Sequence, residues 1–74
     1  MLIKGEVLIE TVKLSFAVSG KRGEWKVGVT APGNITKEDE TIEASWFELF
    51  NELLADVYTK ACNRRFPERI RVVR

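Results

Sequence analysis

Four acidic side chains gather in one short stretch of the chain, at Glu38, Asp39, Glu40 and Glu43. Carboxylate oxygens are the ligands that Mg²⁺ and Ca²⁺ prefer, so the stretch is a candidate cation site. It lacks the turn glycine and the alternating ligand spacing of a calcium loop. Negative charge ahead of a helix and in its first turn is stabilised by the helix dipole, by about 0.3–1 kcal/mol per charge. This structural role accounts for the cluster, and we predict no metal site and no cofactor.

Nucleophilic side chains are present, but the base that would activate them is missing. The chain has one cysteine, Cys62, and no histidine. A thiol or hydroxyl nucleophile needs a neighbouring base, and histidine is the commonest base near neutral pH. Cys62 is expected to fill space on a helix, and a single thiol cannot form an internal disulfide. These residues predict that the protein is not an enzyme.

Charge is segregated along the chain although its net value is only +1. Residues 27–56 carry seven acidic side chains and one lysine, whereas residues 57–74 carry six basic side chains and one glutamate. A basic partner would meet the acidic region and an acidic partner the arginines, and the sequence does not choose between them. The candidate protein-binding residues are Glu43, Glu48, Glu52, Asp56, Arg64, Arg65, Arg69 and Arg71.

Nucleic acid is the alternative partner, because arginine and lysine contact phosphates. The near-neutral net charge and the absence of a glycine-rich clamp or paired aromatic platform do not favour it. The residues that would serve this alternative are Lys21, Arg22, Lys26, Arg64, Arg65, Arg69 and Arg71.

The N-terminal half of the chain shows the two-residue periodicity of β-strands. Apolar residues alternate over Leu2 to Val18 with a change of face near Ile9, which fits either one bulged strand or two strands joined by a sharp bend. Residues 19–23 predict a hairpin turn, followed by a return strand around Trp25. A Pro-Gly turn then precedes a brief third strand at Ile35 and Thr36.

An amphipathic helix is the clearest element of the second half. Apolar residues recur at three- and four-residue steps from Ile42 to Ala61. Thr41 is the preferred N-cap and Ser45 the alternative, and the helix should end near Asn63. Pro67 precedes a final alternating strand over residues 69–72. Side chains at the margin of the apolar stripe are a candidate interaction surface: Phe47, Leu49 and Tyr58.

These elements predict one α+β domain over residues 1–74. An antiparallel sheet, with two to three strands before the helix and one after it, packs against one long helix in the order β-β-β-α-β. The chain is too short for two cores. Its first residues resemble neither a signal peptide nor a membrane span, so a cytoplasmic location is expected. An unpaired leading strand also predicts a homodimer formed by strand pairing.

This order of motifs resembles the HicB-like antitoxin domain over residues 23–74. That family is typified by a glycine-aromatic return strand, a Pro-Gly turn, a short strand, an acidic helix start with threonine, and a proline-containing link to the last strand. The counterparts here are Gly23-Glu24-Trp25-Lys26-Val27-Gly28-Val29, Pro32-Gly33, Ile35-Thr36, Asp39-Glu40-Thr41-Ile42-Glu43-Ala44 and Phe66-Pro67-Glu68.

The resemblance implies a non-catalytic antitoxin-like or inhibitor-like module that binds and neutralises a protein partner. In the family's typical case that partner is a HicA-like RNA-cleaving toxin. Double-stranded-RNA-binding domains share a similar β-β-β-α order, which keeps RNA binding as the alternative function. No helix precedes the first strand here, and the start of the predicted helix is acidic where that family places its lysines.

Overall fold

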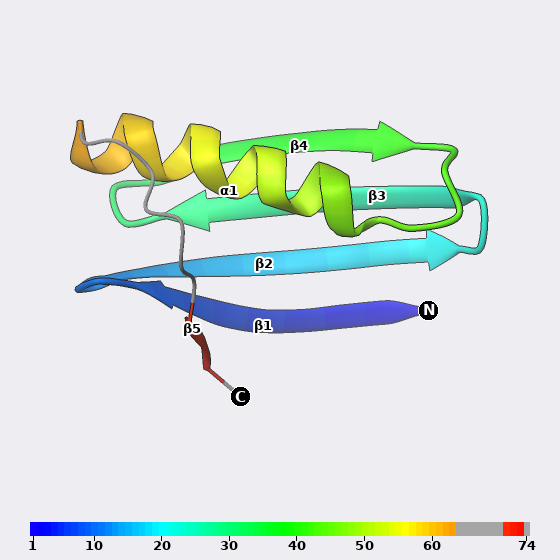
Figure 1. Cartoon of the computed structure of the whole chain (residues 1–74), viewed down its shortest axis with the longest axis horizontal. Coiled ribbons are helices and arrows are strands. Elements are labelled where there is room, and N and C mark those ends of the chain that lie inside the picture. Colours follow the sequence, from blue (N-terminus) through cyan, green and yellow to red (C-terminus); the bar gives the residue numbers. More distant parts are fainter. Residues whose placement is uncertain (64–70, 74) are drawn as a thin grey trace.

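The computed structural model describes residues 1–63 and 71–73. They form an antiparallel sheet with one helix on one of its faces, in which the helix lies over β3 and β4 (Figure 1). The strands lie side by side in the order β4-β3-β2-β1-β5. The elements are β1 (Leu2–Ile9), β2 (Val12–Lys21), β3 (Glu24–Ala31), β4 (Ile35–Thr41), α1 (Phe47–Cys62) and β5 (Arg71–Val73).

The α+β class is confirmed, but the order β-β-β-α-β is wrong because four strands precede the helix. The first 18 residues form two strands rather than one bulged strand, joined by a turn in which Glu10 has a φ of 56°. Val7 pairs with Leu14 and Ile3 with Val18. The odd positions of β1 and the even positions of β2 therefore lie on the same face of the sheet. This explains why the apolar residues change from odd to even positions in the sequence.

The fourth strand extends beyond the predicted Ile35 and Thr36 to include the whole charged run. β4 pairs with β3 from Ala31–Ile35 to Trp25–Thr41, seven residue pairs in succession. The acidic residues Glu38, Asp39 and Glu40 are therefore strand residues, and their assignment to the start of a helix is wrong. The turn at Gly33 and Asn34, both with positive φ, brings the chain back along β3, so the ladder overrides the low strand propensity of charged residues.

The core lies between α1 and the face of the sheet that carries the odd positions of β3. Val7 of β1, Leu14 of β2 and Val27 of β3 are fully buried, with Leu54 and Val57 of α1 above them. Near the start of α1, the Phe50 ring packs on Phe16 with 4.8 Å between ring centroids. Among the described residues no polar or charged side chain other than Tyr58 and Trp25 falls in the buried class.

The helix begins later than the sequence indicates. α1 starts at Phe47 after Trp46, Ser45 Oγ accepts a hydrogen bond from the Phe47 N–H at 3.3 Å, and Thr41 is the last residue of β4 rather than an N-cap. Ile42 is consequently 86% exposed in the connection instead of lying on the apolar stripe. The predicted end near Asn63 is confirmed. Phe47 is exposed as expected, whereas Tyr58 is buried, which corrects its assignment to an outer surface.

The final strand pairs with the leading strand. β5 lies antiparallel to β1, with Glu6 opposite Val73 and Leu8 opposite Arg71. Arg69 and Ile70, which the sequence also assigned to this strand, lie outside the described residues. Over Glu6–Leu8 the leading strand has neighbours on both sides, so this part of β1 is not the open edge on which the predicted homodimer relied. The homodimer itself stays a prediction.

Candidate functional site

Acidic residues of two separate segments lie on neighbouring elements at the β4 edge of the sheet, because α1 packs against β4 (Figure 1). Here this surface is named the acidic edge. All six of its carboxylates are exposed. It consists of Glu38, Asp39 and Glu40 on β4 together with Glu48, Glu52 and Asp56 on α1.

On the helix, these carboxylates form one row. Glu48, Glu52 and Asp56 are spaced four residues apart, which places them one above another on an α-helix. The residues beside them in the sequence, such as Leu53 and Val57, are buried against the sheet. The amphipathic pattern that buries these apolar residues therefore also places the acidic row on the exposed face of the helix. Three of the predicted protein-binding residues lie together in this row.

Lys37 connects the two halves of the acidic edge. Its ammonium group donates a hydrogen bond to Asp56 and forms an ion pair with it across the gap between β4 and α1. This hydrogen bond and the attraction of Asp56 raise the pKa of Lys37, with further contributions from Asp39 and Glu52. The same contact lowers the pKa of Asp56. Asp39 of β4 and Glu52 and Asp56 of α1 are thus close enough to act on one ammonium group.

The backbone of β4 adds a second feature to this surface. β4 is the last strand in the sheet order, so among the described strands only one of its two sides is paired, and that side pairs with β3. The Glu40 N–H donates to Oδ1 of Asp39, the preceding side chain, at 2.8 Å. This donor is therefore directed away from β3. Because donors alternate along an antiparallel strand, the Thr36 and Glu38 N–H groups share its outward direction.

Glu43 does not join the helical row to which the sequence assigned it. It lies in the connection between β4 and α1, exposed, with its backbone N–H donating to Thr41 Oγ1 at 3.2 Å. The assignment to the helix face is wrong because α1 begins at Phe47. Glu43 therefore lies before the helix instead of on the row of acidic helix residues.

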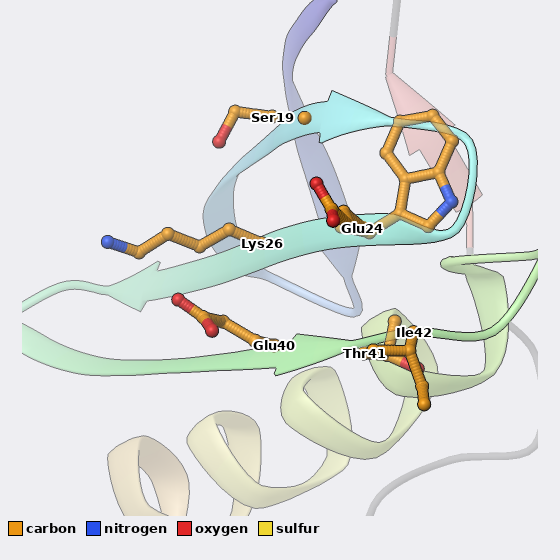
Figure 2. Close-up of a pocket in the computed structure, with 8 residues that line it drawn as sticks. Ser19, Glu24, Lys26, Glu40, Thr41 and Ile42 are labelled. Carbon is orange, nitrogen blue, oxygen red and sulfur yellow. The ribbon is translucent and has the colours of Figure 1, made fainter.

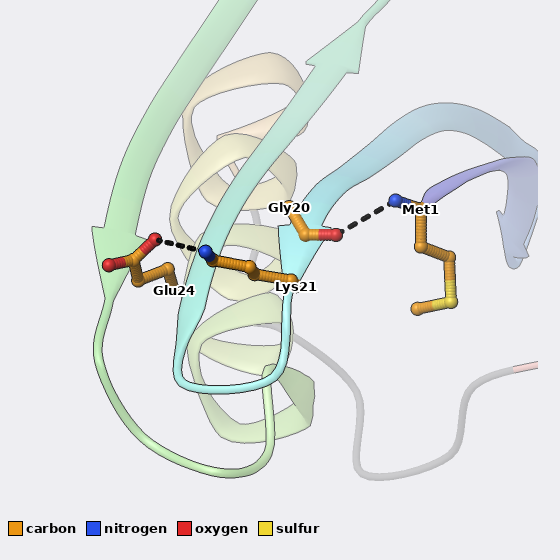
Figure 3. Close-up of polar contacts among 4 residues, drawn as sticks. All are labelled: Met1, Gly20, Lys21 and Glu24. Carbon is orange, nitrogen blue, oxygen red and sulfur yellow. Dashed lines mark hydrogen bonds and ion pairs between the residues drawn. The ribbon is translucent and has the colours of Figure 1, made fainter.

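The basic hairpin residues proposed for nucleic acid have acidic neighbours. Lys21 Nζ lies 4.0 Å from the Glu24 carboxylate across the β2–β3 turn (Figure 3), and Lys26 Nζ lies 3.6 Å from Glu38. Arg22 is exposed in that turn. Each of the two lysines thus faces a carboxylate that would compete with a phosphate for it.

The C-terminal arginines are placed only in part. Arg71 belongs to β5, opposite Leu8 of β1. Arg64, Arg65 and Arg69, which served both the protein-binding and the nucleic-acid hypotheses, lie outside the described residues. The two predicted surfaces can therefore be compared only through their acidic members and the hairpin.

A shallow hollow of about 440 Å³ lies at the end of the sheet where β2 turns into β3 (Figure 2). Ser19, Lys26 and Glu40 form a row of neighbours on β2, β3 and β4, and Ile42 also lines the hollow. Trp25 is also among the residues that line it, although its side chain belongs to the core, where the buried ring N–H has no acceptor among the described residues. Glu40 belongs to both this hollow and the acidic edge.

Potential metal ligands do not converge in the part of the chain that the structure describes. Within residues 1–63 and 71–73, no group of three potential ligand side chains comes close enough together to hold a metal ion. Cys62 is a free, half-buried thiol in the last turn of α1. No described helix has the length and apolar character needed to cross a membrane.

The feature that the sequence analysis missed is the open edge of β4. Its signal was present in the turn, since Pro32-Gly33-Asn34 directly after an eight-residue strand requires a return strand of similar length. Comparison with protein-family models, curated proteins and solved structures finds no match to this chain. The resemblance to the HicB-like domain therefore stays a prediction from the order of motifs.

Proposed function

We propose that this protein is a non-catalytic binding module that acts by attaching its acidic edge to a basic surface of a protein partner. One observation carries the proposal: Asp39 of β4 and Glu52 and Asp56 of α1, which lie far apart in the sequence, act on the same ammonium group of Lys37 because α1 packs against β4. Lys37 is the one basic residue of the sequence between Val27 and Asp56. Such a surface attracts basic partners and speeds their association.

An inhibitor-like role follows from the chemistry of this surface. Proteins that bind or cleave nucleic acid present basic sites to phosphates. A rigid array of carboxylates offers the same sign of charge, so it fits such a site and blocks access to it. The proposed partner class is therefore a protein with a basic functional surface, such as a toxin or nuclease, as the HicB-like resemblance also implies.

The test is a comparison of two charge variants in affinity purification from the native host, each with and without nuclease treatment. Glu48→Lys with Glu52→Lys reverses the helical row of the acidic edge. Glu6→Lys with Glu24→Lys makes a charge change of equal size and sign at exposed residues of β1 and β3, outside the acidic edge. We expect a nuclease-resistant protein partner that the first variant loses and the second retains.

Two results would overturn the proposal. One is recovery of the same partner with equal yield by both variants, since the acidic edge would then play no part. The other is recovery of nucleic acid alone, which would support the RNA-binding alternative through the basic residues. The salt dependence of binding adds a second readout, because attraction between charged surfaces weakens as ionic strength rises.

A further inference from the structure

We propose that the outer edge of β4 binds an extended, basic segment of the partner as an additional β-strand. This inference rests on the proposed function and specifies how the partner is held. Strand addition requires hydrogen bonds to the backbone of β4 as well as attraction to its carboxylates. It therefore predicts effects that charge attraction alone does not predict.

The first step is the backbone. β4 ends the strand order, and in the described part of the chain no strand pairs with its outer side. The Glu40 N–H on that side is bonded only to the Asp39 carboxylate, at 2.8 Å, and the Glu38 N–H points the same way by the alternation of the ladder. An edge with such groups is the template on which proteins add a strand from another chain.

The second step is the chemistry of the occupant. Glu38 and Glu40 project on the sheet face away from α1, whereas Asp39 projects on the face that carries α1. A strand added beside β4 would therefore lie beside two carboxylates on the face away from α1, and beside Asp39 together with Lys37 on the other face. Opposite charges across adjacent strands are favourable, and like charges directly opposite are unfavourable. Lysine or arginine at alternate positions is the pattern that this edge selects.

The third step excludes a second copy of the same edge. In a two-fold antiparallel pairing of β4 with itself, the central residue lies directly opposite its own copy. The middle of β4 is Lys37-Glu38-Asp39-Glu40, in which every residue is charged. Each register centred there consequently sets two like charges against each other. The edge discourages self-pairing and favours a strand of the opposite charge.

The test uses two capped peptides of about seven residues, a typical strand length, one alternating lysine with valine and the other alternating glutamate with valine. Two variants at one position separate backbone from charge. Glu38→Pro removes the outward N–H together with the carboxylate, and Glu38→Gln removes only the charge. Proline is tolerated in edge strands where its missing N–H faces outward, so the ladder with β3 is retained.

We expect the full-length protein to bind the lysine peptide and not the glutamate peptide in fluorescence anisotropy. Glu38→Gln should weaken the lysine peptide about threefold, as expected for one exposed charge pair, and Glu38→Pro about tenfold, because a backbone hydrogen bond is lost as well. Equal losses in the two variants would overturn strand addition, since charge alone would then explain the binding.

A second measurement needs no variant. Addition of the lysine peptide to the unmodified protein should slow the hydrogen exchange of the Glu38 and Glu40 amides and leave that of Asp39 unchanged. Unchanged exchange at Glu38 and Glu40 would also overturn the inference, even if Glu38→Pro were to unfold the protein.

The failure of strand addition is distinguishable from the failure of the proposed function. A native partner that is retained by Glu38→Pro but lost by Glu48→Lys with Glu52→Lys would overturn strand addition and leave the acidic edge as the binding surface. A partner that is retained by all of these variants would overturn both.

Discussion

At the scale of the residue, Gly5 shows how a missing side chain makes room for a neighbouring ring. It lies opposite Phe16, and a Cβ at this position would be 2.7 Å from Cζ of Phe16. The ring cannot move freely because it packs on Phe50. We expect Gly5→Ala to lower the free energy of unfolding by about 1–3 kcal/mol, the usual cost of overpacking, as measured by urea denaturation.

The matched control is Gly28, a glycine inside β3 whose close neighbours are atoms of one side chain. A Cβ there would lie 3.1 Å from Cγ of Glu38, an exposed and flexible side chain that can move aside. Gly28→Ala should change the free energy of unfolding by less than about 0.5 kcal/mol. A loss as large as that of Gly5→Ala would contradict the role assigned to the Phe16 ring.

At the scale of the element, the end of α1 depends on one left-handed residue. Asn63 has a φ of 53°, and its N–H donates to the Thr59 carbonyl at 2.8 Å. Glycine adopts this conformation without steric cost, whereas alanine does not. Asn63→Gly should therefore raise the free energy of unfolding by roughly 0.5 kcal/mol. Asn63→Ala should lower it by about 1 kcal/mol. Thermal unfolding followed by circular dichroism measures both, and the reverse order would contradict the prediction.

The pair that joins β4 to α1 gives the protein a small pH dependence. Contact with Lys37 lowers the pKa of Asp56 below its ordinary 3.8, so the unfolded chain takes up the proton first as the pH falls. The stability that the pair contributes is present above 3.8 and is lost below it, through the lower pKa of the folded state. On the alkaline side the pKa of Lys37 is raised, so its contribution is present below 10.5 and is lost above that pH.

Asp56→Asn tests this dependence. The free energy of unfolding of the variant should fall below that of the unmodified protein at neutral pH, and the two should converge as the pH drops below 3.8. The difference is small because both side chains are exposed. Urea unfolding at a series of pH values measures it, and a difference that is constant across the acid range would refute the assignment.

Some of these elements could be predicted from local patterns in the sequence, and others could not. The alternation in residues 2–18 and the helical stripe ending near Asn63 reflect burial, which local periodicity reports directly. β4 was largely missed because its charged residues have low strand propensity and are held by their ladder with β3. The acidic row of α1 was predicted, but its approach to β4 through Lys37 depends on tertiary packing that a linear sequence does not display.

At the scale of the whole molecule, charge on β4 should limit the pairing of two copies through that edge. Replacing the three acids together, by Glu38→Gln, Asp39→Asn and Glu40→Gln, leaves an uncharged backbone template apart from Lys37. Because charge protects exposed edges from pairing, this variant should self-associate more strongly than the unmodified protein in sedimentation velocity.

The control for this change is Glu48→Gln with Glu52→Gln, which neutralises the helical part of the acidic edge and leaves the strand part unaltered. It should sediment like the unmodified protein. Equal self-association of the two variants would assign the effect to net charge instead of the β4 edge.

The sheet order described above sets the sequence of folding events. β1 to β4 are joined by turns of two or three residues, so each of their pairings connects neighbouring segments of the chain. The pairing of Glu6 with Val73 instead spans nearly the entire chain. Closing so long a loop costs more entropy than closing a hairpin, and contacts of this kind slow folding. We expect the four-strand meander to form first and β5 to dock last, which pulsed hydrogen exchange during refolding would show as late protection of the β5 amides.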